Sequence, residues 1–375
     1  MDMEETAVKK PEKKKKKTRI IWILIFIAVN VLVIGYTAIH EFGSKSPEKL
    51  NIHLSPSTVF FLLAAAGCAV GAILMETIKY LMMMKALKER VSLKAALQTA
   101  TLGKYYDCIT PSGIGGQPFQ IYNMHREGYG AGAAVAIPLM SFLTMQIGFI
   151  VLALFTFFVW GNIDIEPFFR AAAYFGCFCY ALVPGFIILF TVKPGIATKL
   201  LILLIKLGAK VHLIKDPKAK MEGLVRSLGE YRDAIKLMSK NVSLLLRLLL
   251  CSVAYHFAIM CIPYFVLQLF NGSTSFVGTV AMTLFTYAAI TFIPTPGNAG
   301  AAEGSFYIIF SEMDPSGLFW AMLIWRFFSY YLFIGFGVAV YIYNAVKARA
   351  KKKVDELKEK HQNKKNTKEG PPLER

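Results

Sequence analysis

The sequence predicts an all-α integral membrane protein with six spanning helices and two re-entrant helical hairpins, arranged as an inverted repeat. Three observations lead to this prediction. Hydrophobic residues make up 55% of the chain, whereas soluble domains contain about 45–50%. Several apolar runs approach or exceed the roughly 20 residues that a helix needs to cross the hydrocarbon of a bilayer. Two similar Pro- and Gly-rich stretches, 110–122 and 294–305, interrupt the apolar sequence.

Seven charge-poor runs are candidates for membrane helices. They are Ile20–Ile39, Thr58–Met75, Ala131–Trp160, Ala171–Val192, Val242–Phe270, Phe276–Ile293 and Gly317–Ala345. The first run is longer than the apolar region of a signal peptide, which has about 7–15 residues, and no small-residue cleavage site follows it. We therefore expect the first run to remain as a membrane anchor.

Basic residues are concentrated in a few segments. Eight Lys and Arg residues precede Ile20, eleven lie in Lys193–Lys240, and eleven more lie from Lys347 to the end of the chain. Basic connections stay on the cytoplasmic side of a membrane, so both termini are expected there. The net charge of +18 then indicates attraction to an anionic lipid surface. Nucleic acid is not an expected partner, because no nucleic-acid-binding motif accompanies the charge.

The number of times that the chain crosses the membrane decides on which side each of the two interrupted segments begins and ends. With the basic segments inside, residues 95–125 begin and end on the cytoplasmic side, and they either lie at the surface or dip into the membrane. Residues 276–315 begin and end outside, but their apolar run cannot lie in water, so it enters the membrane and returns. The two halves then have inverted topology, as in many transporters. The turns "ITPSGIGG" and "IPTPGNAG" read as rough copies of each other.

The chain is accordingly divided into three parts. Residues 1–19 form a basic cytoplasmic arm, residues 20–346 the membrane domain, and residues 347–375 a basic tail. Within the membrane domain, an amphipathic segment at about 193–240 is expected to lie on the inner leaflet. The tail has too few apolar residues to pack, and we expect it to be largely disordered.

The first break in the apolar sequence is a candidate site for a lipid headgroup. Its glycines allow close backbone approach and can form an anion-binding nest, and the start of the following helix directs N–H groups at an anion. The alternative is a tight turn packed against neighbouring helices. The residues that we assign to substrate binding here are Thr110, Ser112, Gly113, Gly115, Gly116, Gln117 and Gln120.

The second break adds Pro296, Gly297 and Asn298 to the predicted substrate site. Glu303 follows them, and an acid inside a membrane segment is a functional candidate by default because it is costly to bury. Glu303 could bind a cationic headgroup, or it could complement the dipole of the returning helix. Arg326, in the last run, could hold a lipid phosphate or pair with Glu303.

Four further polar residues are weighed individually. Lys104 and Asp107 are three residues apart, so they form either a local ion pair or a polar pair exposed inside the membrane. Arg126 is expected at the level of the cytoplasmic headgroups, where it could contact a lipid phosphate. His256 lies on an apolar face, which favours a hydrogen-bonded interior histidine over a ligand.

The remaining polar and sulfur-containing residues are given structural roles. Glu76 and Lys79 have the spacing of an ion pair, and we expect this pair at the membrane interface. The six cysteines lie within or beside apolar segments, and no pair has metal-ligand spacing, so we expect small buried thiols. Neither a metal nor a cofactor is expected.

The segments "KYYDCITPSGIGGQPFQIY", "FIPTPGNAGAAEGSF" and "WRFFSYY" resemble the flippase-like membrane domain of MprF-type lysylphosphatidylglycerol synthases. The resemblance covers residues 20–347. It implies a lipid-handling fold in a bacterial plasma membrane, which moves aminoacylated phosphatidylglycerol from the inner to the outer leaflet. Those relatives carry a soluble synthase domain after the membrane part, whereas only about thirty residues follow Ala345 here. The resemblance therefore implies a stand-alone member, served by a separate lipid aminoacyltransferase if its lipid is aminoacylated.

We expect the chain to translocate a phospholipid, such as aminoacylated phosphatidylglycerol, between leaflets. One alternative is a transporter of a small solute or ion on the same inverted-repeat scaffold. The other is a lipid-modifying enzyme of the lysyltransferase type, which is suggested only by the family name. The sequence contains no G-x-x-x-x-G-K-[ST] phosphate loop, so ATP hydrolysis by this chain is not expected.

Overall fold

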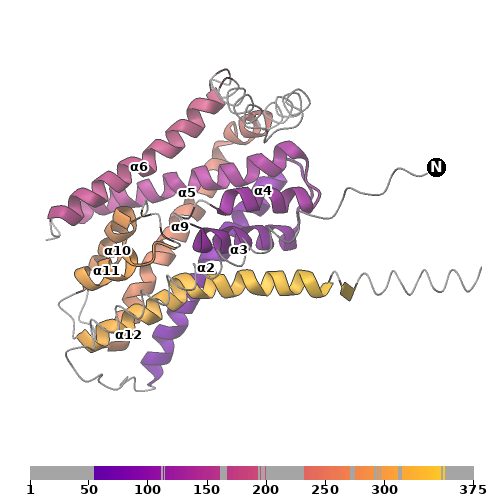
Figure 1. Cartoon of the computed structure of the whole chain (residues 1–375). Coiled ribbons are helices and arrows are strands. Elements are labelled where there is room, and N and C mark those ends of the chain that lie inside the picture. The colour runs from indigo at the N-terminus through magenta and orange to yellow at the C-terminus, as the bar shows by residue number, and fades with distance from the viewer. Residues whose placement is uncertain are drawn as a thin grey trace, which may run out of the picture.

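The computed structural model describes residues 55–110, 113, 115–160, 167–192, 195, 199, 232–270, 275–290, 293, 295, 297–310, 315–347 and 349–350. These residues form helices and their connections, without any strand (Figure 1). The predicted basic arm, the first apolar run, most of the 193–240 segment and the tail beyond residue 350 lie outside the described residues.

The helices follow one another in the order that the apolar runs and the two breaks predict. They are α2 (Pro56–Ala86), α3 (Leu93–Ile109), α4 (Gly116–Arg126), α5 (Ala131–Trp160), α6 (Pro167–Val192), α9 (Val242–Leu267) with the 3₁₀ turn η1 (Gln268–Phe270), α10 (Phe276–Ile290), α11 (Ala301–Ile309), α12 (Pro315–Arg326) and the π-helical segment η2 (Phe327–Tyr331). Helical structure continues from η2 to Lys347.

Four of these helices are long and apolar enough to cross a membrane. They are Pro56–Ala86, Ala131–Phe158, Val242–Phe270 and Gly317–Lys347, and they correspond to the second, third, fifth and seventh predicted runs. The fourth run lies within α6. The sixth run forms α10, which has 15 residues and would extend about 22 Å at 1.5 Å per residue, less than the hydrocarbon thickness. The all-helical class of the prediction is confirmed.

Local sequence determines where several helices begin. Ser55, Ser92 and Asn241 precede α2, α3 and α9, and each side chain accepts a hydrogen bond from the backbone N–H three residues later. Such caps satisfy N–H groups that have no partner inside the helix. Pro56 then occupies the start of α2, where its missing N–H costs nothing.

The centre of the protein is the packing of α2 along α9. Small residues make this possible, since Ala65, Ala69 and Ala72 lie on one face of α2 and are completely buried. Small side chains let two membrane helices approach closely and gain van der Waals contact. The other helices are added to this pair in matching ways: α3 and α5 pack against α2, and α10 and α12 pack against α9.

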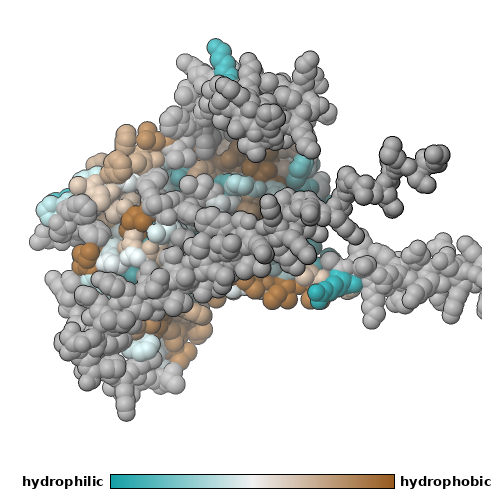
Figure 2. Space-filling view, in the orientation of Figure 1, coloured by the Kyte–Doolittle hydropathy of each residue, from teal (hydrophilic) through white to brown (hydrophobic). Residues whose placement is uncertain are grey.

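The outer faces of the helices are apolar. On α2, large side chains at positions such as Phe60, Leu63 and Leu74 are each about half exposed or more. Figure 2 shows apolar surface along the last helix, followed by hydrophilic residues at its C-terminal end. Val346 and Lys347 are exposed neighbours at this boundary. An apolar surface bounded by charge matches a protein surrounded by lipid.

The prediction of an interfacial Glu76–Lys79 pair is wrong. The two side chains do form an ion pair, with 2.9 Å between Lys79 Nζ and Glu76 Oε2, but Lys79 is completely buried. Lys79 also donates to the Ser141 carbonyl and to Ser252 Oγ, and Ser141 Oγ donates to Glu76 Oε1 at 2.7 Å. The sequence was misleading because α2 continues to Ala86, which places the pair between α2, α5 and α9.

Replacing Lys79 should therefore destabilise the protein strongly. A Lys79→Met variant leaves the Glu76 carboxylate buried without its cation, and loss of one partner of a buried pair costs about 3–5 kcal/mol. We expect a clearly lower Tm in detergent micelles. The exposed Lys85 on the same helix supplies the control Lys85→Met, which should leave Tm nearly unchanged. Equal Tm values for the two variants would contradict the role of the buried network.

Candidate functional site

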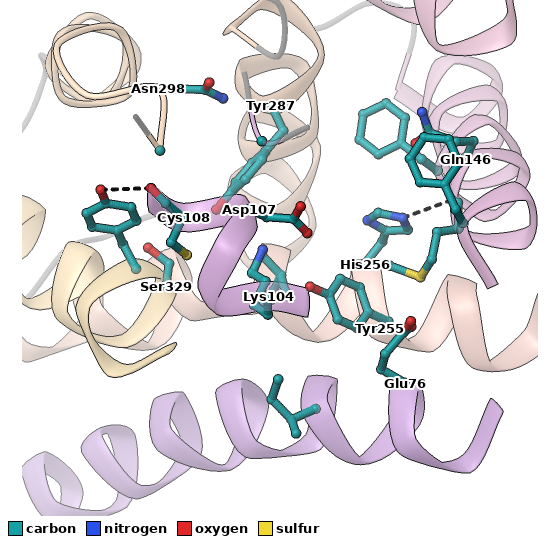
Figure 3. A pocket seen from close by; sticks show the side chains of 18 of the residues that line it. Glu76, Lys104, Asp107, Cys108, Gln146, Tyr255, His256, Tyr287, Asn298 and Ser329 are labelled. Atoms are coloured by element: carbon teal, nitrogen blue, oxygen red, sulfur yellow. Dashed lines mark hydrogen bonds between the residues drawn. The ribbon is translucent and has the colours of Figure 1, made fainter. Parts of the chain in front are cut away.

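A cavity of about 460 Å³ lies between the two interrupted segments. Figure 3 shows side chains from α2, α3, α9 and α10 converging on it. Its polar lining consists of Glu76, Lys104, Asp107, Gln117, Gln120, Gln146, Tyr180, Tyr255, His256, Tyr287, Asn298, Arg326, Ser329 and Tyr330. Phe142, Met145 and Phe149 of α5 form part of its apolar wall. A mixed lining of this kind is typical of a ligand pocket.

The first break is a turn held by short polar side chains. Thr110 Oγ1 donates to the Tyr106 carbonyl at 2.7 Å and accepts from Gly115 N at 2.9 Å. Asp107 Oδ1 accepts from Gly116 N, the first residue of α4, at 2.8 Å. A Cβ on Gly116 would lie only 2.3 Å from that oxygen, so a glycine is required there.

The predicted residues of the first break therefore divide into two groups. Gly113, Gln117 and Gln120 line the cavity. Thr110, Gly115 and Gly116 do not line it, but they shape the turn that carries the others. Ser112 lies outside the described residues.

The second break has a similar conformation. Gly297 has φ +59°, Asn298 +54° and Gly300 +89°, and Gly297 and Asn298 line the cavity. Pro296 lies outside the described residues. When "ITPSGIGG" is placed over "IPTPGNAG", Gly297 coincides with Gly113, whose φ is +63°. Two breaks on separate hairpins thus use a left-handed residue at the same place, which glycine adopts without strain.

A carboxylate also holds the start of each returning helix. In the second break Glu303 Oε2 accepts from Gly300 N at 2.7 Å, as Asp107 accepts from Gly116 N in the first. Gly116 and Gly300 occupy equivalent places in the two aligned turns. Both acids therefore satisfy N–H groups and complement the positive end of a helix dipole.

Glu303 and Arg326 form the ion pair that the sequence offered as one alternative. Arg326 Nε is 2.6 Å from Glu303 Oε1, and both side chains are more than nine-tenths buried. Arg326 Nη1 also donates to the Gly297 carbonyl at 3.2 Å. Arg326 lines the cavity and Glu303 does not. Glu303 therefore binds the backbone of the turn and the guanidinium of Arg326, and Arg326 forms part of the cavity wall.

The π-helical segment η2 connects the last helix to both turns. Tyr330 donates from its hydroxyl to the Cys108 carbonyl at the end of α3. On the other side, the Tyr330 ring lies against Gly297, where an added Cβ would be 2.0 Å from Cε2. Segments of π-helix occur often at functional sites, and this one places Ser329 and Tyr330 in the cavity wall.

Lys104 and Asp107 lie in the cavity, near each other (Figure 3). The ion pair that was one of the two alternatives for these residues is not found in the described part of the chain, and Asp107 instead accepts a hydrogen bond from Gly116 N. Lys104 Nζ lies 5.3 Å from the centre of the Phe333 ring and 6.0 Å from that of Tyr255. Lys104 therefore lines the cavity without an ion-pair partner among the described residues.

His256 is a hydrogen-bonded histidine in the interior of the protein, as the sequence predicts. Its Nε2 lies 3.0 Å from the Met145 carbonyl, and since a carbonyl only accepts, Nε2 donates. Arg126 lies away from the cavity at the end of α4, where it donates to Asn123 and has a side chain that is 42% exposed. Its predicted position at the headgroup level stays a prediction.

Several lining residues were not selected from the sequence. Tyr255, Tyr287 and Gln146 were not singled out. A signal was present for Ser329 and Tyr330, because both lie in "WRFFSYY" beside Arg326. Tyr255, Gln146 and Tyr287 come from three different apolar helices, α9, α5 and α10, and only the packing of those helices brings them together.

The apolar helices define a helical membrane protein, and its interior contains a cavity with a partly polar lining. The family model described as "Lysylphosphatidylglycerol synthase TM region" matches residues 20–337, and the chain belongs to this family. A UPF0104 membrane protein of Archaeoglobus fulgidus is 25% identical over 338 residues, which cover 88% of this chain and 98% of the relative. No solved structure matches the chain.

The second turn can be tested by adding a single methyl group. Gly297→Ala puts a side chain at φ +59° and against Tyr330, which should cost about 1–3 kcal/mol and lower Tm in detergent. Gly304→Ala is the matched control, because its Cβ would meet nothing within 4 Å and alanine favours a helix. The two variants should therefore shift Tm in opposite directions, and a parallel shift would contradict this description of the turn.

Proposed function

We propose that this protein translocates a phospholipid between the leaflets of the membrane, with the headgroup passing through the cavity between the two turns. The observation that carries the proposal is the convergence of two broken helical segments on one polar cavity inside an apolar helical protein. Non-helical backbone at membrane depth is stable only when it is buried in protein or lines an aqueous cavity. Both breaks meet this condition here.

The proposed topology has six spans and two re-entrant hairpins in an inverted repeat. Ile20–Ile39 and α6 are taken as the spans that begin the two halves. Matching contacts support the repeat: α2, α3, α4 and α5 contact one another in the same pattern as α9, α10, α11 and α12. The shared positions of Gly113 and Gly297 support it independently. In this topology residues 20–346 form the membrane domain and both termini are cytoplasmic.

The cavity has the charge and size for a phospholipid headgroup. The ion pairs among the described residues do not include Lys104, and Arg326 Nη2 has no hydrogen-bond partner there. Both can donate charge-assisted hydrogen bonds to a phosphate. A volume of about 460 Å³ is too small for a phospholipid with two acyl chains, so the chains remain in the surrounding lipid.

The surface proposed to be cytoplasmic is basic. Lys85 at the end of α2 is exposed, as are Lys88 and Arg90 in the connection between α2 and α3. Arg90 donates to the Glu127 carbonyl after α4. This connection would lie against an anionic leaflet, together with Arg126. Attraction of this kind concentrates anionic lipid near the cavity entrance.

The lipid that we favour is a phosphatidylglycerol, aminoacylated by a separate enzyme, because the family name refers to lysylphosphatidylglycerol synthase. A bacterial origin likewise stays a prediction, since the relative named above is archaeal. Transport of a small solute and a lysyltransferase-type reaction are alternatives that use the same cavity. Each predicts a different product in the experiment below.

Leaflet exchange in proteoliposomes tests the proposal. A membrane-impermeant quencher reaches only the fluorescent phosphatidylglycerol in the outer leaflet. In vesicles that contain the protein, fluorescent lipid from the inner leaflet should therefore be quenched faster than in protein-free vesicles. Lys104→Gln removes a charged donor worth about 1.5–3 kcal/mol, so exchange should slow by about tenfold or more. Lys236→Gln, at an exposed site, is the matched control and should exchange lipid like the wild type.

Three outcomes would contradict the proposal. No exchange above protein-free vesicles, for plain or lysylated phosphatidylglycerol, would rule out lipid translocation. Uptake of a small solute without lipid exchange would favour the transporter. A new lipid species in the vesicle extract would favour the enzyme.

A further inference from the structure

The two carboxylates that hold the returning helices are in different electrostatic environments. Glu303 is paired with Arg326 at 2.6 Å, and both are buried. Asp107 makes the equivalent contact to Gly116, but no guanidinium or ammonium pairs with it in the described part of the chain. Two turns that otherwise match therefore differ in one respect, which is whether the acid has its own cation.

Of these two acids, Asp107 lines the cavity and Glu303 does not. Its own helix contributes Lys104 and Cys108 to the same lining. The neighbouring elements contribute these titratable or charged groups: Glu76 from α2, Tyr180 from α6, Tyr255 and His256 from α9, Tyr287 from α10, and Arg326 and Tyr330 from α12 and η2.

Most of the charges around Asp107 are already committed to other partners. Glu76 is paired with Lys79, Arg326 with Glu303, and His256 donates to the Met145 carbonyl. Lys104 and Asp107 are left as the cavity-lining cation and anion, three residues apart on one helix. Groups at this spacing lie on the same helix face, so each affects what the other can bind.

We propose that Asp107 is a proton-binding site, and that it takes up a proton when the phosphate of a lipid headgroup binds to Lys104. This inference rests on the proposed function and names the ion that accompanies the lipid. The proton comes from the bulk solution, where the buffer acid supplies it, and it bonds to one carboxylate oxygen of Asp107. The other oxygen still accepts the hydrogen bond from Gly116 N, so the turn is kept.

Charge balance is the physical reason for this coupling. Lys104 with a phosphodiester is neutral, but an ionised Asp107 beside them makes the group carry a net charge of −1. A net charge is costly inside a membrane, and the carboxylate also repels the phosphate and competes for Lys104. Protonation of Asp107 removes all three effects. By linkage, proton binding and headgroup binding must favour each other equally.

Counting protons during headgroup binding tests the inference. Dihexanoyl-phosphatidylglycerol, as the soluble probe, would be titrated into the full-length protein in detergent by calorimetry near neutral pH, in buffers with different ionisation enthalpies. Its phosphodiester keeps its charge, so any proton taken up binds to the protein. We expect uptake of up to about one proton per probe molecule, and tighter binding as the pH is lowered.

Asp107→Asn should bind the probe without proton uptake, because an amide oxygen can still accept from Gly116 N. Asp233→Asn, at an exposed acid outside the cavity, is the control and should behave like the wild type.

Probe binding without proton uptake by the wild type would overturn the inference and leave the proposed function intact, even if Asp107→Asn failed to fold. Uptake that persists in Asp107→Asn would overturn the assignment to this residue. No probe binding at all would count against the proposed function itself.

Discussion

The fold depends on satisfying backbone polar groups where two helices are broken inside an apolar protein. A peptide N–H or carbonyl without a partner in such surroundings costs several kcal/mol. Asp107 and Glu303 provide acceptors for the N–H groups at the start of α4 and α11. Arg326 and Tyr330 provide donors for carbonyls at the two breaks. The same few polar side chains that permit the breaks therefore also form the cavity wall.

Side chains of the last helix contact both of the broken segments. Arg326, the last residue of α12, donates to the Gly297 carbonyl in the second break, and Tyr330 in η2 donates to the Cys108 carbonyl at the first. A change in the position of η2 would consequently affect both hairpins together. Alternating exposure of one cavity to two leaflets requires coordination of this kind, and the buried Glu76–Lys79 network keeps α2, α5 and α9 fixed around it.

The sequence predicted the parts of this structure that depend on local patterns. Apolar length predicted the long helices, and the Pro- and Gly-rich stretches predicted both breaks. The left-handed backbone at Gly113 and Gly297 was not predicted, and only the structure shows it. The prediction placed the Glu76–Lys79 pair wrongly because hydropathy does not show that α2 continues to Ala86. Tyr255 and Tyr287 were missed for a different reason: an aromatic residue in an apolar run looks the same whether it faces lipid or a cavity, and only packing decides between them.

The central claim is that a lipid phosphate binds at Lys104, between the two turns. An experimental density map of the protein in nanodiscs containing phosphatidylglycerol tests it most directly. We predict headgroup density in the cavity, with the phosphate within hydrogen-bonding distance of Lys104 Nζ and the acyl chains leaving between helices toward the lipid. A cavity without headgroup density, in a map that resolves lipids elsewhere on the protein, would contradict the account.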